Sequence, residues 1–163
     1  MPKKIETNRL YLRQWQKMDL EPFSKMNSDK DVMEYFPKLL SKEESDAMAS
    51  KCQSLIEERG WGIWAVSLKD SGAFIGFVGL HQPQYDFPFN PCIEIGWRLD
   101  KEFWGYGYAT EAANAALKFA FEELELNESY TLENGVTTLK LDNPINNLVC
   151  VMTNLAFPSA VLH

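Results

Sequence analysis

The sequence is poor in the residues that build several common kinds of active site. Its 163 residues include two histidines, His81 and His163, and three cysteines. No histidine–cysteine cluster has the spacing of metal ligands, so we expect no metal site. A Ser-His-Asp or Cys-His hydrolase would depend on His81, and no nucleophile-elbow motif accompanies it. We expect His81 to stand at the end of a strand instead.

Long apolar runs are also missing. No run approaches the roughly 20 residues that span a bilayer, and the start, "MPKKIETNRLYLRQW", lacks the apolar core of a signal peptide. Cys52, Cys92 and Cys150 are odd in number and far apart, which favours reduced thiols over a disulfide framework. We therefore expect a cytoplasmic protein with no membrane partner.

Positive charge is scarce relative to negative charge. Lysine and arginine number 16 against 23 aspartates and glutamates, for a formal net charge of −7. This balance argues against a nucleic-acid partner and is compatible with cationic substrates such as amines. The apolar share of 45% and the length predict one globular domain over residues 1–163, without repeats or a linker.

The order of periodic segments predicts an α+β fold rather than a regular βαβ array. Capping residues predict short helices starting at Asp19 and Asp29, the second ended by Pro37, and a helix from Ser41 to Gly60. Alternating segments predict strands at 11–15, 63–68, 73–80 and 92–99, the middle two forming a hairpin turned at 70–72. In the strand 92–99, Glu94, Gly96 and Arg98 should share one face.

The segment "FWGYGYATEAANAALKFAFEEL", residues 103–124, contains the clearest helix, with an apolar stripe that begins with alanines. Gly105 and Gly107 precede it. Two interpretations fit: a backbone cradle for a diphosphate at a helix N-terminus, with Thr110 adding a hydroxyl, or a tight turn capped by Thr110. The motif lacks the third glycine and the βαβ context of a dinucleotide-binding fingerprint, so a Rossmann fold is rejected.

The ordered set of segments resembles the Gcn5-related N-acetyltransferase (GNAT) superfamily, in particular its RimJ/RimL-like branch of ribosomal-protein N-terminal acetyltransferases. The resemblance depends on "ETNRLYLRQW", "MNSDKDVMEYFP", "WGIWAVSLKDSGAFIGFVGL" and "CIEIGWRLDKEFWGYGYATEAANAALKFAFEEL". It implies a mixed, mostly antiparallel twisted sheet flanked by helices. It also implies transfer of an acetyl group from acetyl-CoA, as cosubstrate, to a primary amine.

The resemblance also implies which residues bind the cofactor. The family's diphosphate loop corresponds to residues 102–109, with Glu102 in place of the usual Gln or Arg. The strand before the loop corresponds to 92–99, with Gly96 as a bulge. The cofactor-binding residues implied are Trp97, Arg98, Leu99, Trp104, Gly105, Tyr106, Gly107, Tyr108, Ala109 and Thr110.

The chemistry requires a base for the amine proton, and Glu94 is the candidate. The alternative for Glu94 is a solvated strand carboxylate. An acid for the leaving thiolate is commonly a tyrosine in this family, but Tyr130 does not match the usual position, so no acid is assigned.

The resemblance extends over roughly residues 5 to 128 and weakens in 129–163, so we expect an atypical or shortened C-terminal part. "YTLENGVTTLKLD" predicts a hairpin turned at Asn134-Gly135. The closing strands that the family has after this part could come from a partner subunit of a homo-oligomer or be absent. The alternative function is a CoA-binding or interaction protein that has lost efficient acetyl transfer.

Overall fold

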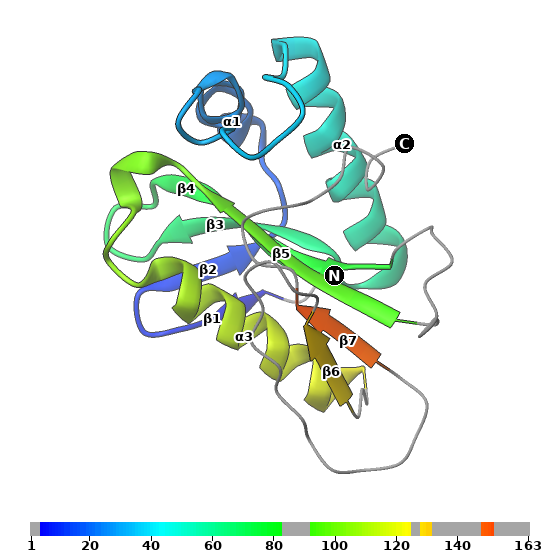
Figure 1. The fold of residues 1–163 in the computed structure, drawn as a ribbon. Helices are drawn as coiled ribbons and strands as arrows, with labels where there is room; N and C mark the ends of the chain where they lie inside the picture. The colour runs from blue at the N-terminus through cyan, green and yellow to red at the C-terminus, as the bar shows by residue number, and fades with distance from the viewer. Residues whose placement is uncertain (1–3, 83–91, 125–127, 132–147, 152–163) are drawn as a thin grey trace.

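The chain folds around one mixed β-sheet with helices on both faces (Figure 1). The structure, a computed structural model, describes residues 4–82, 92–124, 128–131 and 148–151. Its strands are β1 (Ile5–Glu6), β2 (Leu10–Arg13), β3 (Ile63–Leu68), β4 (Phe74–His81), β5 (Cys92–Leu99), β6 (Glu128–Thr131) and β7 (Leu148–Val151). The strand order is β1-β2-β3-β4-β5-β7-β6. Strands β1 to β5 pair antiparallel, whereas β7 lies parallel to both β5 and β6. The predicted α+β class with a mostly antiparallel sheet is confirmed.

The helices divide between the two faces of the sheet. They are the short 3₁₀ helices η1 (Lys17–Asp19) and η2 (Lys101–Phe103) and the α-helices α1 (Leu20–Ser28), α2 (Lys42–Arg59) and α3 (Tyr108–Glu123). Helices α1 and α2 cover one face and α3 the other (Figure 1). Ring contacts show both layers: Phe77 of β4 packs edge-on against Phe23 of α1, and Trp64 of β3 packs edge-on against Phe119 of α3. No helix in these ranges is long and apolar enough to cross a membrane.

Local sequence patterns correctly predicted α2 and the central hairpin. The Ser41 hydroxyl accepts a hydrogen bond from the Glu44 N–H at 3.1 Å, and the Glu44 carboxylate accepts one from the Ser41 N–H at 2.9 Å. This capping box starts α2, and Gly60 ends it with a left-handed φ of 80°. The hairpin of β3 and β4 also matches the prediction, and His81 is the last residue of β4.

The predicted helix starting at Asp29 is wrong. Residues 29–36 form turns, and Asp29 ends α1 with an extended backbone, φ −81° and ψ 124°. The Asp29 carboxylate accepts a hydrogen bond from the Asp31 N–H at 2.8 Å and pairs with Lys101 at 2.7 Å. The side chain thus satisfies a local turn and a tertiary ion pair instead of starting a second helix.

Near the N-terminus, the end of the first predicted strand is wrong, whereas the predicted helix does start after Asp19. Strand β2 ends at Arg13, and Trp15 beyond it is buried, with its indole N–H donating to the Ile63 carbonyl at 2.8 Å. Asp19 stands at the N-cap position of α1, but its buried carboxylate makes no capping bond to that helix. The carboxylate instead accepts from Arg13 and from the Gln16 N–H, which holds the 3₁₀ turn before α1.

The predicted hairpin at Asn134-Gly135 lies outside the described residues. In the described part of the tail, β7 lies between β5 and β6, and its pairing with β5 covers Cys92 to Ile95. From Gly96 to Leu99 the edge of β5 away from β4 has no strand partner in the ranges given above.

Candidate active site

Two glycines with left-handed backbone form the connection from β5 to α3. Gly105 has a φ of 81° and Gly107 a φ of 78°, a conformation that residues with a Cβ rarely adopt. Two contacts fix the residues just before the turn. Asp100 caps η2, and the Trp104 indole N–H donates to the Leu99 carbonyl at 2.9 Å. Helix α3 then begins at Tyr108, with Gly107 as its N-cap and no side-chain cap.

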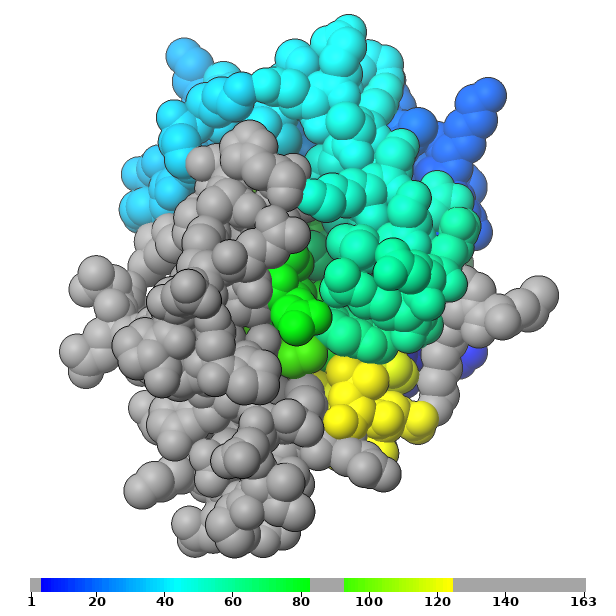
Figure 2. Space-filling view, turned by 90° about the vertical axis from the view of Figure 1, so that its right-hand side faces the viewer, coloured from blue at the N-terminus to red at the C-terminus, as the bar shows by residue number. Residues whose placement is uncertain are grey.

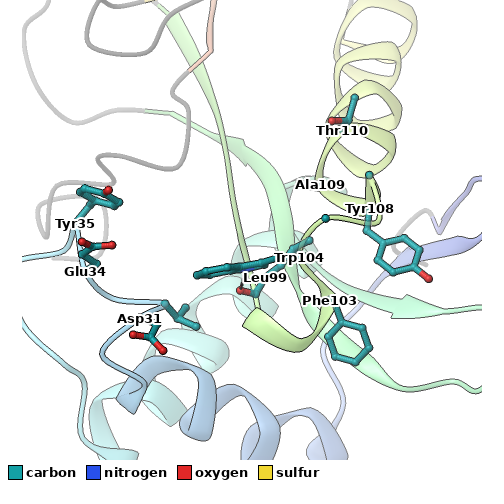
Figure 3. Close-up of a pocket in the computed structure, with 12 residues that line it drawn as sticks. Asp31, Glu34, Tyr35, Leu99, Phe103, Trp104, Tyr108, Ala109 and Thr110 are labelled. Carbon is teal, nitrogen blue, oxygen red and sulfur yellow. Dashed lines mark hydrogen bonds between the residues drawn. The ribbon is translucent and has the colours of Figure 1, made fainter.

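The turn forms one wall of a cavity of about 470 Å³ (Figure 3). The turn and its flanks contribute Leu99, Phe103, Trp104, Gly105, Gly107, Tyr108, Ala109 and Thr110. The segment after α1 contributes Asp31, Val32, Glu34 and Tyr35. In Figure 3, Glu34 and Tyr35 stand opposite Thr110 and Ala109. The resemblance pointed to the first group; the second group was not predicted, because the sequence does not show where this segment folds.

The backbone of the turn offers hydrogen-bond donors to this cavity. None of the N–H groups from Gly105 to Thr110 donates to another described residue. The first turn of α3 has no earlier carbonyl to pair with, and the helix dipole adds about half a positive charge there. Such a set of free donors at a helix N-terminus is suited to bind an anion such as a diphosphate.

Several predicted site residues do not line the cavity with their side chains. Tyr106 is 61% exposed, and its ring stacks on the Tyr108 ring with centroids 5.7 Å apart. Arg98 turns to the other face of the sheet, where its guanidinium donates to the Asn27 amide oxygen of α1 and lies 4.1 Å from the centroid of the Phe36 ring. Burial lowers the pKa of Arg98 to about 10, so it stays charged at neutral pH.

The expected bulge at Gly96 is not present against β4. Every residue of β5 from Glu94 to Leu99 pairs one-to-one with β4, including Gly96 opposite Gly79. The irregular register lies instead between Val66 and Ser67 of β3. Beyond Ile95, no described residue pairs with the edge of β5 that lies away from β4, and we call this stretch the free edge of β5. No bulge against β4 contributes to it.

Glu94 is a buried carboxylate on the face of β5 that α1 and α2 cover. It is 0% exposed, which excludes the solvated strand carboxylate, and both its oxygens lack a hydrogen-bond partner among the described residues. Burial raises the pKa of Glu94 to about 7. A group with this pKa can take up a proton at neutral pH.

His81 lies directly opposite Glu94 across the β4–β5 pair. Burial, and next the positive charges of Arg59 and Lys51 on α2, lower the pKa of His81 to about 4, so the imidazole is neutral at pH 7. Figure 2 shows green atoms from the ends of β4 and β5 at the surface, between α2 and the end of α3. The side chains of His81 and Glu94 are nonetheless buried, at 7% and 0% exposure.

The two parts of the candidate site lie along one strand. Leu99 borders the cavity at one end of β5, and Glu94 stands five residues earlier, on the order of 15 Å away at about 3.3 Å per residue. Tyr130, the tyrosine considered as an acid, is in β6, with β7 between it and β5.

Comparison with known proteins agrees with this geometry. The sequence family described as "Acetyltransferase (GNAT) domain" matches residues 9–135. An uncharacterized N-acetyltransferase of Bacillus subtilis (strain 168), YnaD, is 31% identical over 123 residues, covering 75% of this chain and 68% of YnaD. The crystal structure of a GNAT-family acetyltransferase from Bacillus anthracis superposes with a TM-score of 0.64 at 28% identity, over 77% of this chain and 70% of that one.

Ribosomal-protein acetyltransferases are among the solved structures that share the fold. A RimL structure, a ribosomal L7/L12 α-N-protein acetyltransferase in complex with coenzyme A, superposes with a TM-score of 0.57 at 17% identity, over 74% of this chain and 69% of that one. The RimJ/RimL-like resemblance noted in the sequence is therefore supported at the level of the fold.

Proposed function

Because this chain belongs to the GNAT family of acetyltransferases, we propose that it transfers the acetyl group of acetyl-CoA to a primary amine. The observation that carries the proposal is the cavity at the start of α3, which is bordered by a run of backbone N–H groups that donate to no described residue. The acetyl thioester supplies the activated acyl group, so the protein has to bind and orient the two substrates and deprotonate the amine.

The N–H groups of residues 105–110 would bind the diphosphate of acetyl-CoA. Their free donors and the dipole of α3 fit two adjacent negative charges, and both glycines permit the backbone shape that exposes them. Trp104 lines the cavity and is 45% exposed, so its side chain would add a contact to the cofactor, whereas the Tyr106 side chain lies outside the cavity.

The free edge of β5 at Trp97, Arg98 and Leu99 would receive the pantetheine arm. An extended amide chain can pair with an unpaired strand edge as an additional strand does. The arm would then run from the cavity along β5 towards Glu94, which brings the thioester end to the buried carboxylate.

Glu94 would act as the base. An amine attacks a thioester only as the neutral form, so a carboxylate near the acetyl group has to accept its proton, directly or through water. The pKa of about 7 places Glu94 between the two protonation states at neutral pH. No metal is part of this scheme.

The acceptor is a protein N-terminus or a small-molecule amine. The RimL protein that shares the fold acts on a ribosomal protein, whereas YnaD is named only as an N-acetyltransferase. The formal net charge of −7 is compatible with a cationic acceptor. We further propose that residues 1–163 work as one domain, in the cytoplasm.

An amine panel tests the function. The purified protein is mixed with acetyl-CoA and with N-terminal peptides, amino sugars and polyamines in turn, and release of free thiol is measured. Turnover with one class supports the proposal. Tight acetyl-CoA binding in a calorimetric titration without turnover for any amine would favour the alternative, a CoA-binding protein without efficient transfer.

A further inference from the structure

Arg9 connects the start of β2 to the glycine turn and α3. Its Nη1 donates to the Tyr106 carbonyl at 3.0 Å, and its Nε donates to Glu111 Oε2 at 2.7 Å. Its backbone N–H donates to Glu111 Oε1 at 2.9 Å, and the Thr7 hydroxyl donates to the same oxygen at 2.5 Å. Four hydrogen bonds thus join two segments that are about a hundred residues apart.

Arg9 contacts the turn from behind, away from the cavity. It is not among the residues that line the cavity, and its guanidinium lies 4.5 Å from the centroid of the Tyr108 ring. In Figure 3 that ring turns away from Asp31 and Glu34, towards the N-terminal strands. A Cβ built on Gly107 would point to Arg9 Nη2 at 3.7 Å, so this side of the glycine also faces Arg9.

The contact with Tyr106 fixes a peptide plane. In a trans peptide the C=O and the next N–H point in opposite directions. Because the Tyr106 carbonyl points back to Arg9, the Gly107 N–H points the other way, to the side of the cavity. This N–H is one of the unpaired donors.

Glu111 adds a charge that Arg9 neutralises. It lies in the first turn of α3, close to where the diphosphate would bind. Burial opposes its ionisation, but hydrogen bonds from Thr7 and Arg9 outweigh burial and lower the pKa of Glu111. Its negative charge is therefore kept, and the guanidinium of Arg9 offsets it.

We propose that Arg9 is a positioning residue for the acetyl-CoA site, which holds the Tyr106–Gly107 peptide so that the Gly107 N–H is directed at the diphosphate. The inference rests on the proposed function, because it names a residue that acts through the same cavity. Glu111 also bonds Thr7 and Arg9, but the bond from the Arg9 guanidinium to the Tyr106 carbonyl is what orients the turn.

Acetyl-CoA titrations of four purified variants test the role of Arg9. Arg9→Met loses the carbonyl bond, and Arg9→Lys keeps a charge but cannot reach both partners with a planar fork. We expect both to raise the dissociation constant about tenfold or more. Glu111→Gln retains the arginine and its bond to Tyr106, so it should bind within about threefold of the parent. Arg59→Met is the matched control, since Arg59 is also exposed and lies over an aromatic ring, 5.6 Å from the Trp61 centroid.

The titrations are repeated at 0.5 M salt to separate orientation from charge. Long-range attraction between exposed charges is largely screened there, whereas an altered peptide plane is not. The ratio of the dissociation constants of Arg9→Met and the parent should therefore be the same at high salt. Thermal unfolding checks that each variant is folded.

Three results would overturn the proposal. A folded Arg9→Met protein that binds as the parent does would show that the turn does not need Arg9. If the difference in affinity between Arg9→Met and the parent disappears at high salt, the effect of Arg9 on binding is one of charge. If Glu111→Gln binds acetyl-CoA as weakly as Arg9→Met, the effect comes from the ion pair. A parent that does not bind acetyl-CoA would instead refute the proposed function, and the role of Arg9 with it.

Discussion

Glu94 shows how burial changes the chemistry of a single residue. Its carboxylate has no exposed surface and no hydrogen-bond partner in the described ranges, and burial raises its pKa to about 7. A base has to be deprotonated to work, so kcat/KM should rise with pH up to about 7 and level off above it. Glu94→Gln preserves the shape and should lower kcat by about 10²–10⁴-fold, the usual contribution of proton-transfer catalysis.

The control for this prediction is acetyl-CoA affinity, which Glu94→Gln should leave nearly unchanged. A pH profile of the variant then separates the roles of the residue. If Glu94→Gln retains both the rate and the pH dependence of the parent, Glu94 is not the base.

The same burial makes the Glu94 charge costly for folding. Its pKa is raised from an ordinary 4.5, so the folded state binds the proton more tightly than the unfolded state, and stability falls as pH rises from about 4.5 to 7. At pH 8 Glu94→Gln should therefore stabilise the protein by on the order of 1–3 kcal/mol, since a pKa unit is worth about 1.4 kcal/mol. Below pH 4, where the carboxyl is protonated in both states, the gain should vanish.

Urea unfolding at pH 8 and pH 4 measures this difference. His81 must be taken into account, because its lowered pKa of about 4 acts in the opposite direction: between about pH 4 and 6.5 it makes stability rise with pH. The histidine is present in both proteins, so comparing parent and variant at one pH cancels it. An equal stability of both proteins at pH 8 would mean that the carboxylate is not desolvated.

At the scale of elements, α3 combines close packing with a free N-terminus. Ala112, Ala116 and Ala120 are fully buried against the sheet, and their small side chains let the helix backbone approach it. Ala116→Leu should destabilise the protein by about 1–3 kcal/mol, because extra methyl groups in a packed core force backbone shifts. Asn114→Leu, an exposed position on the same helix, is the matched control and should change stability by less than about 0.5 kcal/mol. Equal effects of the two variants in denaturant unfolding would contradict the close packing.

Elements with local causes could be predicted from the sequence. Four features each depend on residues within a few positions of one another. They are the capping box at Ser41, the left-handed Gly60, the alternating pattern of β5 and the glycine turn before α3. The prediction of a helix after Asp29 is wrong because an aspartate is equally typical of a helix N-cap and of a turn. The Asp29 carboxylate also pairs with Lys101, about seventy residues away, and the local sequence does not show this contact.

At the scale of the whole molecule, the features that the sequence did not predict are those that depend on the tertiary fold. Three features bring together segments that are distant in sequence. They are the contact between Arg9 and Glu111, the position of Asp31 to Tyr35 beside the cavity, and the place of β7 between β5 and β6. The family resemblance supplied the proposed role of the glycine turn, but it did not supply the residues that support the turn. The position of the turn was therefore predicted from the sequence, and the contacts that hold it were not.

The structure gives the physical reason for a glycine at position 107. A Cβ there would point to Arg9 Nη2, at 3.7 Å, which is an ordinary van der Waals distance, so lack of space is not the reason. The left-handed φ of 78° is what requires glycine, since a branched residue would force the turn into another shape and redirect its N–H groups.

Titration of acetyl-CoA into the parent and into Gly107→Val tests the central claim most directly. We expect the parent to bind, and a folded Gly107→Val protein to bind at least about tenfold more weakly, since the loss of one charge-assisted hydrogen bond to phosphate is worth about 1.5–3 kcal/mol. Cooperative thermal unfolding checks that the variant is folded. If the folded variant binds acetyl-CoA as tightly as the parent, the turn at residues 103–110 is not the diphosphate site.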